Sequence, residues 1–204
     1  FTAGEFEEAC RKAAVADTLS PEQIAAQFLP DTYEVYWSAT PEELIAKIRK
    51  HYSRFWDDAR REKARKLGLT PLQVSVLASI VEEESNRRDE RPKIARLYLN
   101  RLNRGMLLQA DPTVKFATGD FEAKRITGAM LKSGSPYNTY RYPGLPPGII
   151  RYPEAATIDA VLNAPEHSYI YMCARPDGSG YHDFTSDYQT HLDNARRFRK
   201  AAYG

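Results

Sequence analysis

The feature that most constrains the fold is an apolar stretch at residues 72–85 that includes three consecutive glutamates. Thr70 and Pro71 stand before it as a helix N-cap and a first helical residue. At about 100° per residue, the apolar side chains of such a helix form one broad face. They are Val74, Leu77, Ala78, Ile80 and Val81. The stretch therefore predicts a helix to about residue 85 that packs against the core.

The three glutamates fall on different sides of this predicted helix. Glu84 follows Val81 by three residues and Leu77 by seven, so it continues the apolar stripe. Glu82 and Glu83 project at least about 110° from the centre of the stripe, and we expect both to face solvent. Burial and the negative end of the helix dipole both disfavour a charged carboxylate, so we expect a raised pKa for Glu84. A glutamate that keeps its proton near neutral pH is suited to general acid catalysis.

An ion pair is the competing interpretation of Glu84. An arginine from the following helix, such as Arg91 or Arg96, would keep the carboxylate charged and unreactive. The geometry of the helix alone leaves both interpretations open.

Capping and turn signals predict an α+β fold that is dominated by helices, with a small antiparallel sheet and long ordered loops. Further helices are expected at residues 4–15, from Ser20 onward, at 40–67, 92–103, 154–163 and 186–203. Residues 32–37 favour a short strand or an extended segment. Residues 168–174 and 180–184 favour a hairpin across an Asp-Gly turn. Residues 105–153, rich in Gly, Pro, Asn, Ser and Tyr, predict long ordered loops.

Composition narrows the class of protein. The chain has 29 Lys+Arg and 27 Asp+Glu, a net charge of +2, so we do not expect nucleic acid as a partner. No run approaches the roughly 18 apolar residues of a membrane span. Cys10 and Cys173 match no metal-ligand spacing, and the sequence leaves their pairing open. Because residue 1 is Phe, we expect the chain to begin inside a longer protein.

Six short motifs occur in a fixed order after an entry segment at residues 28–33. They are Ala78–Glu84, Tyr98–Leu102, Gly105–Val114, Ser135–Tyr140, Gly144–Gly148 and His182–Thr185. Together they resemble the MltG (YceG-like) family of endolytic murein transglycosylases. The resemblance implies a YceG-like catalytic domain at residues 28–204, preceded by a residual N-terminal helical segment at residues 1–27.

The resemblance implies a lyase that acts on peptidoglycan glycan strands. Such an enzyme cleaves the β-1,4 bond between N-acetylmuramic acid and N-acetylglucosamine within a strand and leaves a 1,6-anhydro end. The family's catalytic glutamate is the second of a Glu-Lys-Glu pattern, which falls on Glu84. We expect no cofactor and no metal. The resemblance also suggests cell-wall synthases as partners, and a location at the outer, periplasmic face of the cytoplasmic membrane through an N-terminal anchor that this chain lacks.

Several further residues are candidates for substrate binding. Gln109 and Asp111 carry groups that bond sugar hydroxyls or N-acetyl amides, although Asp111 fits equally well as the N-cap of a helix that starts at Pro112. His182 is expected either to bind substrate or to orient a loop. A polar and aromatic cluster is suited to lining a sugar groove or to packing within its loop: Tyr137, Asn138, Thr139 and Tyr140.

Three other functions are alternatives to a murein transglycosylase. A metal hydrolase would use His182, Asp183 and His191, but their spacing differs from H-E-x-x-H and no further ligand is evident. A pyridoxal-phosphate lyase needs a Schiff-base lysine with phosphate-binding glycines, and no motif indicates them. The alternative that we retain is a non-catalytic module that binds or scaffolds peptidoglycan.

Overall fold

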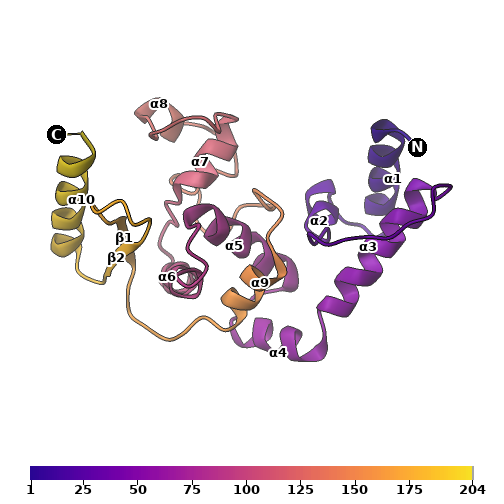
Figure 1. The fold of residues 1–204 in the computed structure, drawn as a ribbon, viewed down its shortest axis with the longest axis horizontal. Helices are drawn as coiled ribbons and strands as arrows, with labels where there is room; N and C mark the ends of the chain where they lie inside the picture. Colours follow the sequence, from indigo (N-terminus) through magenta and orange to yellow (C-terminus); the bar gives the residue numbers. More distant parts are fainter. Residues whose placement is uncertain (204) are drawn as a thin grey trace.

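The computed structural model describes residues 1–203, which form a helix-rich α+β fold with one two-stranded antiparallel sheet (Figure 1). This confirms the predicted fold class. The helices are α1 (Ala3–Ala16), α2 (Pro21–Ala25), α3 (Pro41–Phe55), α4 (Asp58–Lys66), α5 (Pro71–Glu84), α6 (Arg91–Asn103), α7 (Asp111–Thr118), α8 (Gly128–Leu131), α9 (Ala155–Leu162) and α10 (Tyr188–Tyr203). The strands are β1 (Tyr171–Ala174) and β2 (His182–Thr185).

Local capping explains where several helices begin. The side chains of Thr2, Ser20, Thr40 and Thr70 each accept a hydrogen bond from the backbone N–H three residues on, and the backbone N–H of each cap donates to the Glu or Gln side chain at that later position. These reciprocal bonds satisfy donors that a helix N-terminus otherwise leaves unpaired. The predicted helix starts are therefore confirmed to within a few residues.

The predicted helix over residues 40–67 is wrong in one respect, because the structure divides it into α3 and α4. Trp56 leaves the helical conformation with a ψ of 66°, and its side chain is buried with 1% exposure. Asp57 then caps α4 by accepting a hydrogen bond from the Arg60 backbone. Residues 32–37 form no strand and are not in regular secondary structure.

The segment from residue 105 to 153 is also more regular than expected, because α7 and α8 interrupt it. The stretch between α8 and α9 is irregular but tied to the core. For example, the Ile150 backbone N–H donates to the Ser79 hydroxyl on α5 at 3.1 Å. This long connection is therefore an ordered wall of the molecule.

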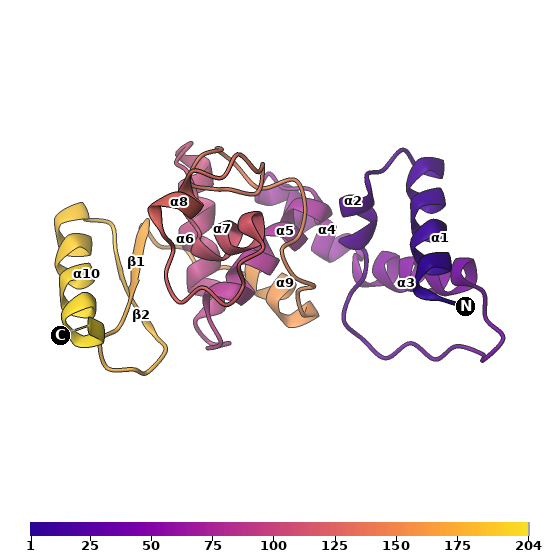
Figure 2. The same ribbon diagram turned by 90° about the horizontal axis from the view of Figure 1, so that it is seen from above.

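Helix α5 is the central element of the core. Every residue from Val74 to Glu82 is buried, because α5 is surrounded by α6, α7 and α9 (Figures 1 and 2). Large core side chains from the surrounding elements include Trp56, Ile94, Leu97 and Ile158. Since α5 has no free long face, a carboxylate near its end must find partners inside the protein.

Three parts lie side by side along the molecule (Figure 2). Helices α1–α3 pack together at one end, α4–α9 form the central body, and the β1–β2 hairpin packs against α10 at the other end. In the hairpin, His182 pairs with Ala174 and Thr185 with Tyr171. Within residues 1–203, no helix is both long and apolar enough to cross a membrane.

Candidate active site

A cleft of about 760 Å³ lies where the central body meets the hairpin and α10. Its lining comes from the end of α5, from α6, from the segments around residues 108–111, 124–131 and 140, and from β1, β2 and α10. Five of the predicted site residues line this cleft: Glu84, Gln109, Asp111, Tyr140 and His182. The fold thus brings together residues that are almost 100 positions apart in the sequence.

Glu84 is the last residue of α5, and its carboxyl group is half-buried at the wall of the cleft. The hydroxyl of Tyr98 donates a hydrogen bond to its Oε1 at 2.5 Å. Burial raises the pKa of Glu84 to about 7, and the hydrogen bond from Tyr98 opposes that rise. The charges of Asp111 and Glu83 add to the rise. The predicted rise in pKa is confirmed, and near neutral pH the carboxyl group is poised between its two protonation states.

The two arginines that competed for Glu84 are engaged elsewhere. Arg91 Nη1 donates to the Thr157 hydroxyl at 2.7 Å and lies 3.4 Å from Glu82 Oε2. Arg96 donates to the carbonyls of residues 164 and 165 and forms an ion pair with Glu166 at 3.0 Å. The structure therefore pairs these arginines with other carboxylates.

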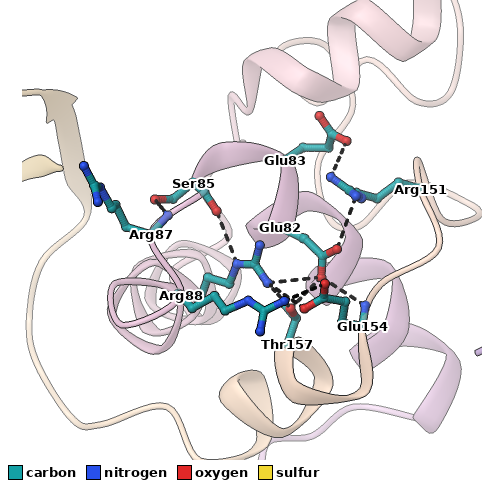
Figure 3. Close-up of polar contacts among 9 residues, drawn as sticks. Glu82, Glu83, Ser85, Arg87, Arg88, Arg151, Glu154 and Thr157 are labelled. Atoms are coloured by element: carbon teal, nitrogen blue, oxygen red, sulfur yellow. Dashed lines mark hydrogen bonds and ion pairs between the residues drawn. The ribbon is translucent and has the colours of Figure 1, made fainter. Parts of the chain in front are cut away.

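The prediction that Glu82 faces solvent is wrong, since its side chain is 2% exposed. Figure 3 shows its carboxylate among Arg151, Thr157 and the backbone of Glu154. Thr157 Oγ1 and the Glu154 N–H donate to Oε2 at 2.5 and 3.0 Å, and Arg151 Nη2 lies 3.4 Å from Oε1. The helical wheel assumed one buried face, whereas α5 is enclosed on several sides. Glu83 is exposed, as predicted.

Gln109 and Asp111 both line the cleft, two residues apart in the chain. Gln109 has a φ of 52°, and its Oε1 accepts a hydrogen bond from Arg101 Nη2 at 2.6 Å. Asp111 is the first residue of α7 rather than its N-cap, which is Ala110. Its Oδ1 accepts a hydrogen bond from the Tyr140 hydroxyl at 2.6 Å. The interpretation of Asp111 as an N-cap is therefore wrong, and its carboxylate is directed to Tyr140.

The other three residues of the predicted aromatic cluster do not line the cleft. Asn138 is fully buried, and its side chain bonds the carbonyls of residues 131 and 133 and the Tyr140 backbone. Thr139 is 1% exposed and accepts a hydrogen bond from the Ala110 N–H at 3.0 Å. Tyr137 packs on Phe116 with ring centroids 4.7 Å apart. Asn138 and Thr139 therefore hold the loops that carry the cleft residues.

His182 lines the cleft at the first position of β2. Its Nδ1 lies 2.7 Å from Glu90 Oε2, and its backbone N–H donates to Glu90 Oε1 at 2.9 Å. Asp183 pairs with Arg175, and the His191 ring stacks on Tyr171. Within the described part of the chain, no group of three or more His, Cys, Asp or Glu side chains is placed to hold a metal ion.

Three residues of the site were not predicted from the sequence: Tyr98, Arg101 and Glu90. Tyr98 and Arg101 are three residues apart on α6, so they share a helix face, and both line the cleft. That spacing is a signal the sequence does contain. Glu90 carries no such signal, because its partner lies on a distant strand. Cys10 and Cys173 are both free thiols, and Cys173 lines the cleft.

The chain belongs to the YceG-like family, whose sequence profile matches residues 2–197. This confirms the resemblance that the ordered motifs carry. The matched range begins within the predicted N-terminal segment, and the domain boundary after residue 27 stays a prediction.

Individual relatives carry more specific names. A Bacillus subtilis (strain 168) protein named endolytic murein transglycosylase is 32% identical over 149 residues, which is 73% of this chain and 41% of that protein. A Streptococcus pneumoniae (serotype 2, strain D39) protein of the same name is 27% identical over 168 residues, 78% of this chain and 30% of that protein. The chain therefore spans less than half the length of these relatives.

A solved structure has the same fold. The crystal structure of a putative YceG-like protein from Listeria monocytogenes superposes with a TM-score of 0.75 at 26% sequence identity. The superposition covers 94% of this chain and 64% of the Listeria chain. The Listeria protein thus shares the overall arrangement of helices and hairpin described above.

Proposed function

We propose that this chain carries the catalytic part of an endolytic murein transglycosylase. It cleaves the β-1,4 bond between N-acetylmuramic acid and N-acetylglucosamine within glycan strands and leaves 1,6-anhydro ends. The observation that carries the proposal is Glu84, a carboxyl group with a pKa of about 7 at the wall of an open cleft. The names of the relatives support the substrate class.

A single carboxyl group is sufficient for this reaction, whereas most glycosidases use two. Protonated Glu84 gives its proton to the glycosidic oxygen while the bond from that oxygen to C1 of the muramyl sugar breaks. The resulting carboxylate takes the proton of the C6 hydroxyl on the same sugar, and the C6 oxygen bonds to C1. Glu84 ends protonated again and no water is consumed. The nucleophile belongs to the substrate, so it has a high effective molarity.

The surrounding residues support this chemistry in different ways. The Tyr98 hydroxyl occupies Oε1 of Glu84, so Oε2 is the oxygen that carries the proton toward the substrate. Asp111 places a negative charge near Glu84, which favours the protonated form. Arg101 occupies the amide oxygen of Gln109, and the amide nitrogen is left to donate to a sugar. Asp111, Tyr140 and His182 supply further polar groups for the glycan.

The cellular setting is part of the same proposal. We propose peptidoglycan strands as the substrate and association with the cell wall as the location. Cell-wall synthase partners, and an anchor in the cytoplasmic membrane that holds the domain at its periplasmic face, stay predictions from the family resemblance.

Mass spectrometry of products released from purified sacculi tests the proposal. The chain is expected to release fragments with 1,6-anhydro-muramyl ends, and Glu84→Gln is expected to release them at least about 100-fold more slowly while keeping its circular dichroism spectrum. Glu83→Gln is the matched control, because Glu83 is the exposed neighbour on the same helix. Reducing ends would contradict lyase chemistry. Binding to sacculi without any product would favour the non-catalytic module.

A further inference from the structure

We propose that Glu90 and His182 form a positioning pair, in which Glu90 orients the imidazole so that His182 Nε2 accepts a hydrogen bond from a hydroxyl group of the bound glycan. The substrate class rests on the proposed function. The geometry of the pair does not, and it can be tested without turnover.

Glu90 is a buried carboxylate with 7% exposure, at the N-terminal end of α6. It accepts a hydrogen bond from the His182 backbone N–H at 2.9 Å and lies 2.7 Å from the ring Nδ1. The Ser85 hydroxyl donates to it at 3.5 Å. Among the ion pairs formed by residues 1–203, the partner of Glu90 is His182. A buried carboxylate requires such donors, so burial holds the two residues together.

This contact selects one form of the ring. A carboxylate only accepts hydrogen bonds, so Nδ1 of His182 must carry a proton. In the neutral imidazole the other nitrogen, Nε2, then has no proton and acts as an acceptor. Glu90 covers the Nδ1 side of the ring, and the residue lines the cleft, so Nε2 is the nitrogen available to a ligand. Because Glu90 binds both the backbone and the ring, the imidazole is fixed in orientation.

An acceptor at this position complements the rest of the cleft. The cationic side chains that line it, Arg101, Lys124 and Arg125, only donate hydrogen bonds. The carboxylate of Asp111 already accepts one from Tyr140. Each sugar hydroxyl has a proton to donate as well as lone pairs to offer, so a glycan in this cleft needs acceptors. His182 Nε2 supplies one from the hairpin.

His167 provides an internal control with the opposite form. Its Nε2 lies 2.8 Å from the Lys93 carbonyl, which only accepts, and its Nδ1 accepts from the Tyr169 N–H at 3.1 Å. His167 is therefore expected to carry its proton on Nε2. The two histidines lie in one chain and are measured in the same spectrum.

The first test is a two-dimensional ¹H–¹⁵N correlation spectrum of the histidine-labelled chain at about pH 8.5, roughly two units above the ordinary imidazole pKa. We expect the Nδ1–H form for His182 and the Nε2–H form for His167, with assignments from His182→Gln and His167→Gln. Glu90→Ala is expected to remove the preference at His182 and leave His167 unchanged. An Nε2–H form of His182, or a ring still doubly protonated at this pH, would overturn the proposal.

The second test measures affinity for soluble uncrosslinked glycan strands in the Glu84→Gln background, where cleavage is expected to be at least about 100-fold slower. Adding His182→Ala should weaken binding about 2- to 12-fold, the effect of one lost hydrogen bond. Adding Glu90→Ala should weaken it similarly, and the two together no more than His182→Ala alone, because Glu90 acts through His182. Glu166→Ala is the control, since that carboxylate pairs with Arg96 and is 87% exposed.

The outcomes separate the two proposals. Unchanged binding in His182→Ala, or losses that add, would overturn the role of the pair. If Glu90→Ala does not fold, the spectrum of the unaltered chain and the His182→Ala affinity still decide the matter. Absence of glycan cleavage by the unaltered chain would contradict the proposed function and leave the spectroscopic result standing.

Discussion

Glu82 and Glu84 lie two residues apart on α5, and the structure withdraws both carboxyl groups from bulk solvent in different ways. Glu82 forms ion pairs with Arg91 and Arg151 and accepts two further hydrogen bonds, which compensate its negative charge. Figure 3 shows it beside Arg151 and Thr157. Glu84 has one neutral donor, Tyr98, and otherwise faces the cleft. The difference shows that burial alone does not make a carboxyl group reactive; the partners decide whether it keeps its proton.

The two environments arise from the two sides of one helix end. On the side of α9, Arg91 and Arg151 compensate the charge of Glu82, which would otherwise be costly to bury, and Thr157 donates a hydrogen bond to it. On the side of α6 and the cleft, burial and the nearby charge of Asp111 raise the pKa of Glu84 more than the hydrogen bond from Tyr98 lowers it, so the acid stays close to its neutral form. A structural carboxylate and a candidate catalytic acid are thus separated by a rotation of about 200° around the helix.

The largest expected difference is in activity. Glu84→Gln should lower the rate of glycan cleavage by about 10²- to 10⁴-fold, the usual contribution of a general acid. Glu82→Gln should keep most of the activity of whatever fraction remains folded, because Glu82 lies outside the cleft lining. Initial rates of fragment release, normalised to the folded fraction, check this. An equal loss in both variants would break the comparison.

The second prediction concerns stability, for which we expect the substitution of Glu82 to have a larger effect than that of Glu84. Glu82→Ala should lower the free energy of unfolding by about 3–5 kcal/mol, because it leaves the buried guanidinium of Arg91 with the partly exposed Glu154 as its remaining carboxylate partner and removes the acceptor of the Thr157 hydroxyl and the Glu154 N–H. Urea denaturation measures the effect. Glu83→Ala, at an exposed position, should change it by less than about 0.5 kcal/mol. A mild effect of Glu82→Ala would show that the ion pairs contribute little.

The third prediction concerns pH. The pKa of Glu84 is about 7 in the folded chain against an ordinary 4.5, so between these values the folded state binds more protons than the unfolded state. The contribution of Glu84 to stability therefore falls as pH rises from about 4.5 to 7, by about 1–3 kcal/mol after allowance for its partial exposure. The Glu84→Gln variant has no titrating group at this position, so it should not show this fall in stability. Its stability relative to the unaltered chain should increase between pH 5 and pH 8, and a constant difference would contradict the raised pKa.

The smallest effects are expected from the neighbours of Glu84. Activity should decline above about pH 7 as the acid loses its proton. Tyr98→Phe removes a hydrogen bond that lowers the pKa of Glu84, so the decline in activity should move to higher pH. Asp111→Asn removes a charge that raises this pKa, so the decline should move to lower pH. Each shift should be about one pH unit or less, and profiles of kcat/KM measure it. Movement in the same direction would refute the assignment.

Local signals account for the parts of the fold that were predicted well. The capping threonines and serine, the prolines after them and the Asp-Gly turn act over three or four residues, so they can be read without tertiary information. The break at Trp56 could not be read in this way. A buried indole and a cap at Asp57 together outweighed the helical pattern that runs through them.

For the candidate site, the sequence by itself determined that one glutamate continues an apolar stripe, and it indicated four other residues that the fold brings to the same cleft. Only the tertiary structure decided which carboxylate meets arginines and which meets Tyr98, and that Glu90 holds His182. The physical reason is the separation along the chain over which each effect acts. Helix periodicity is a property of neighbours along the chain, whereas the protonation state of a buried acid depends on charges and donors that folding brings from distant segments.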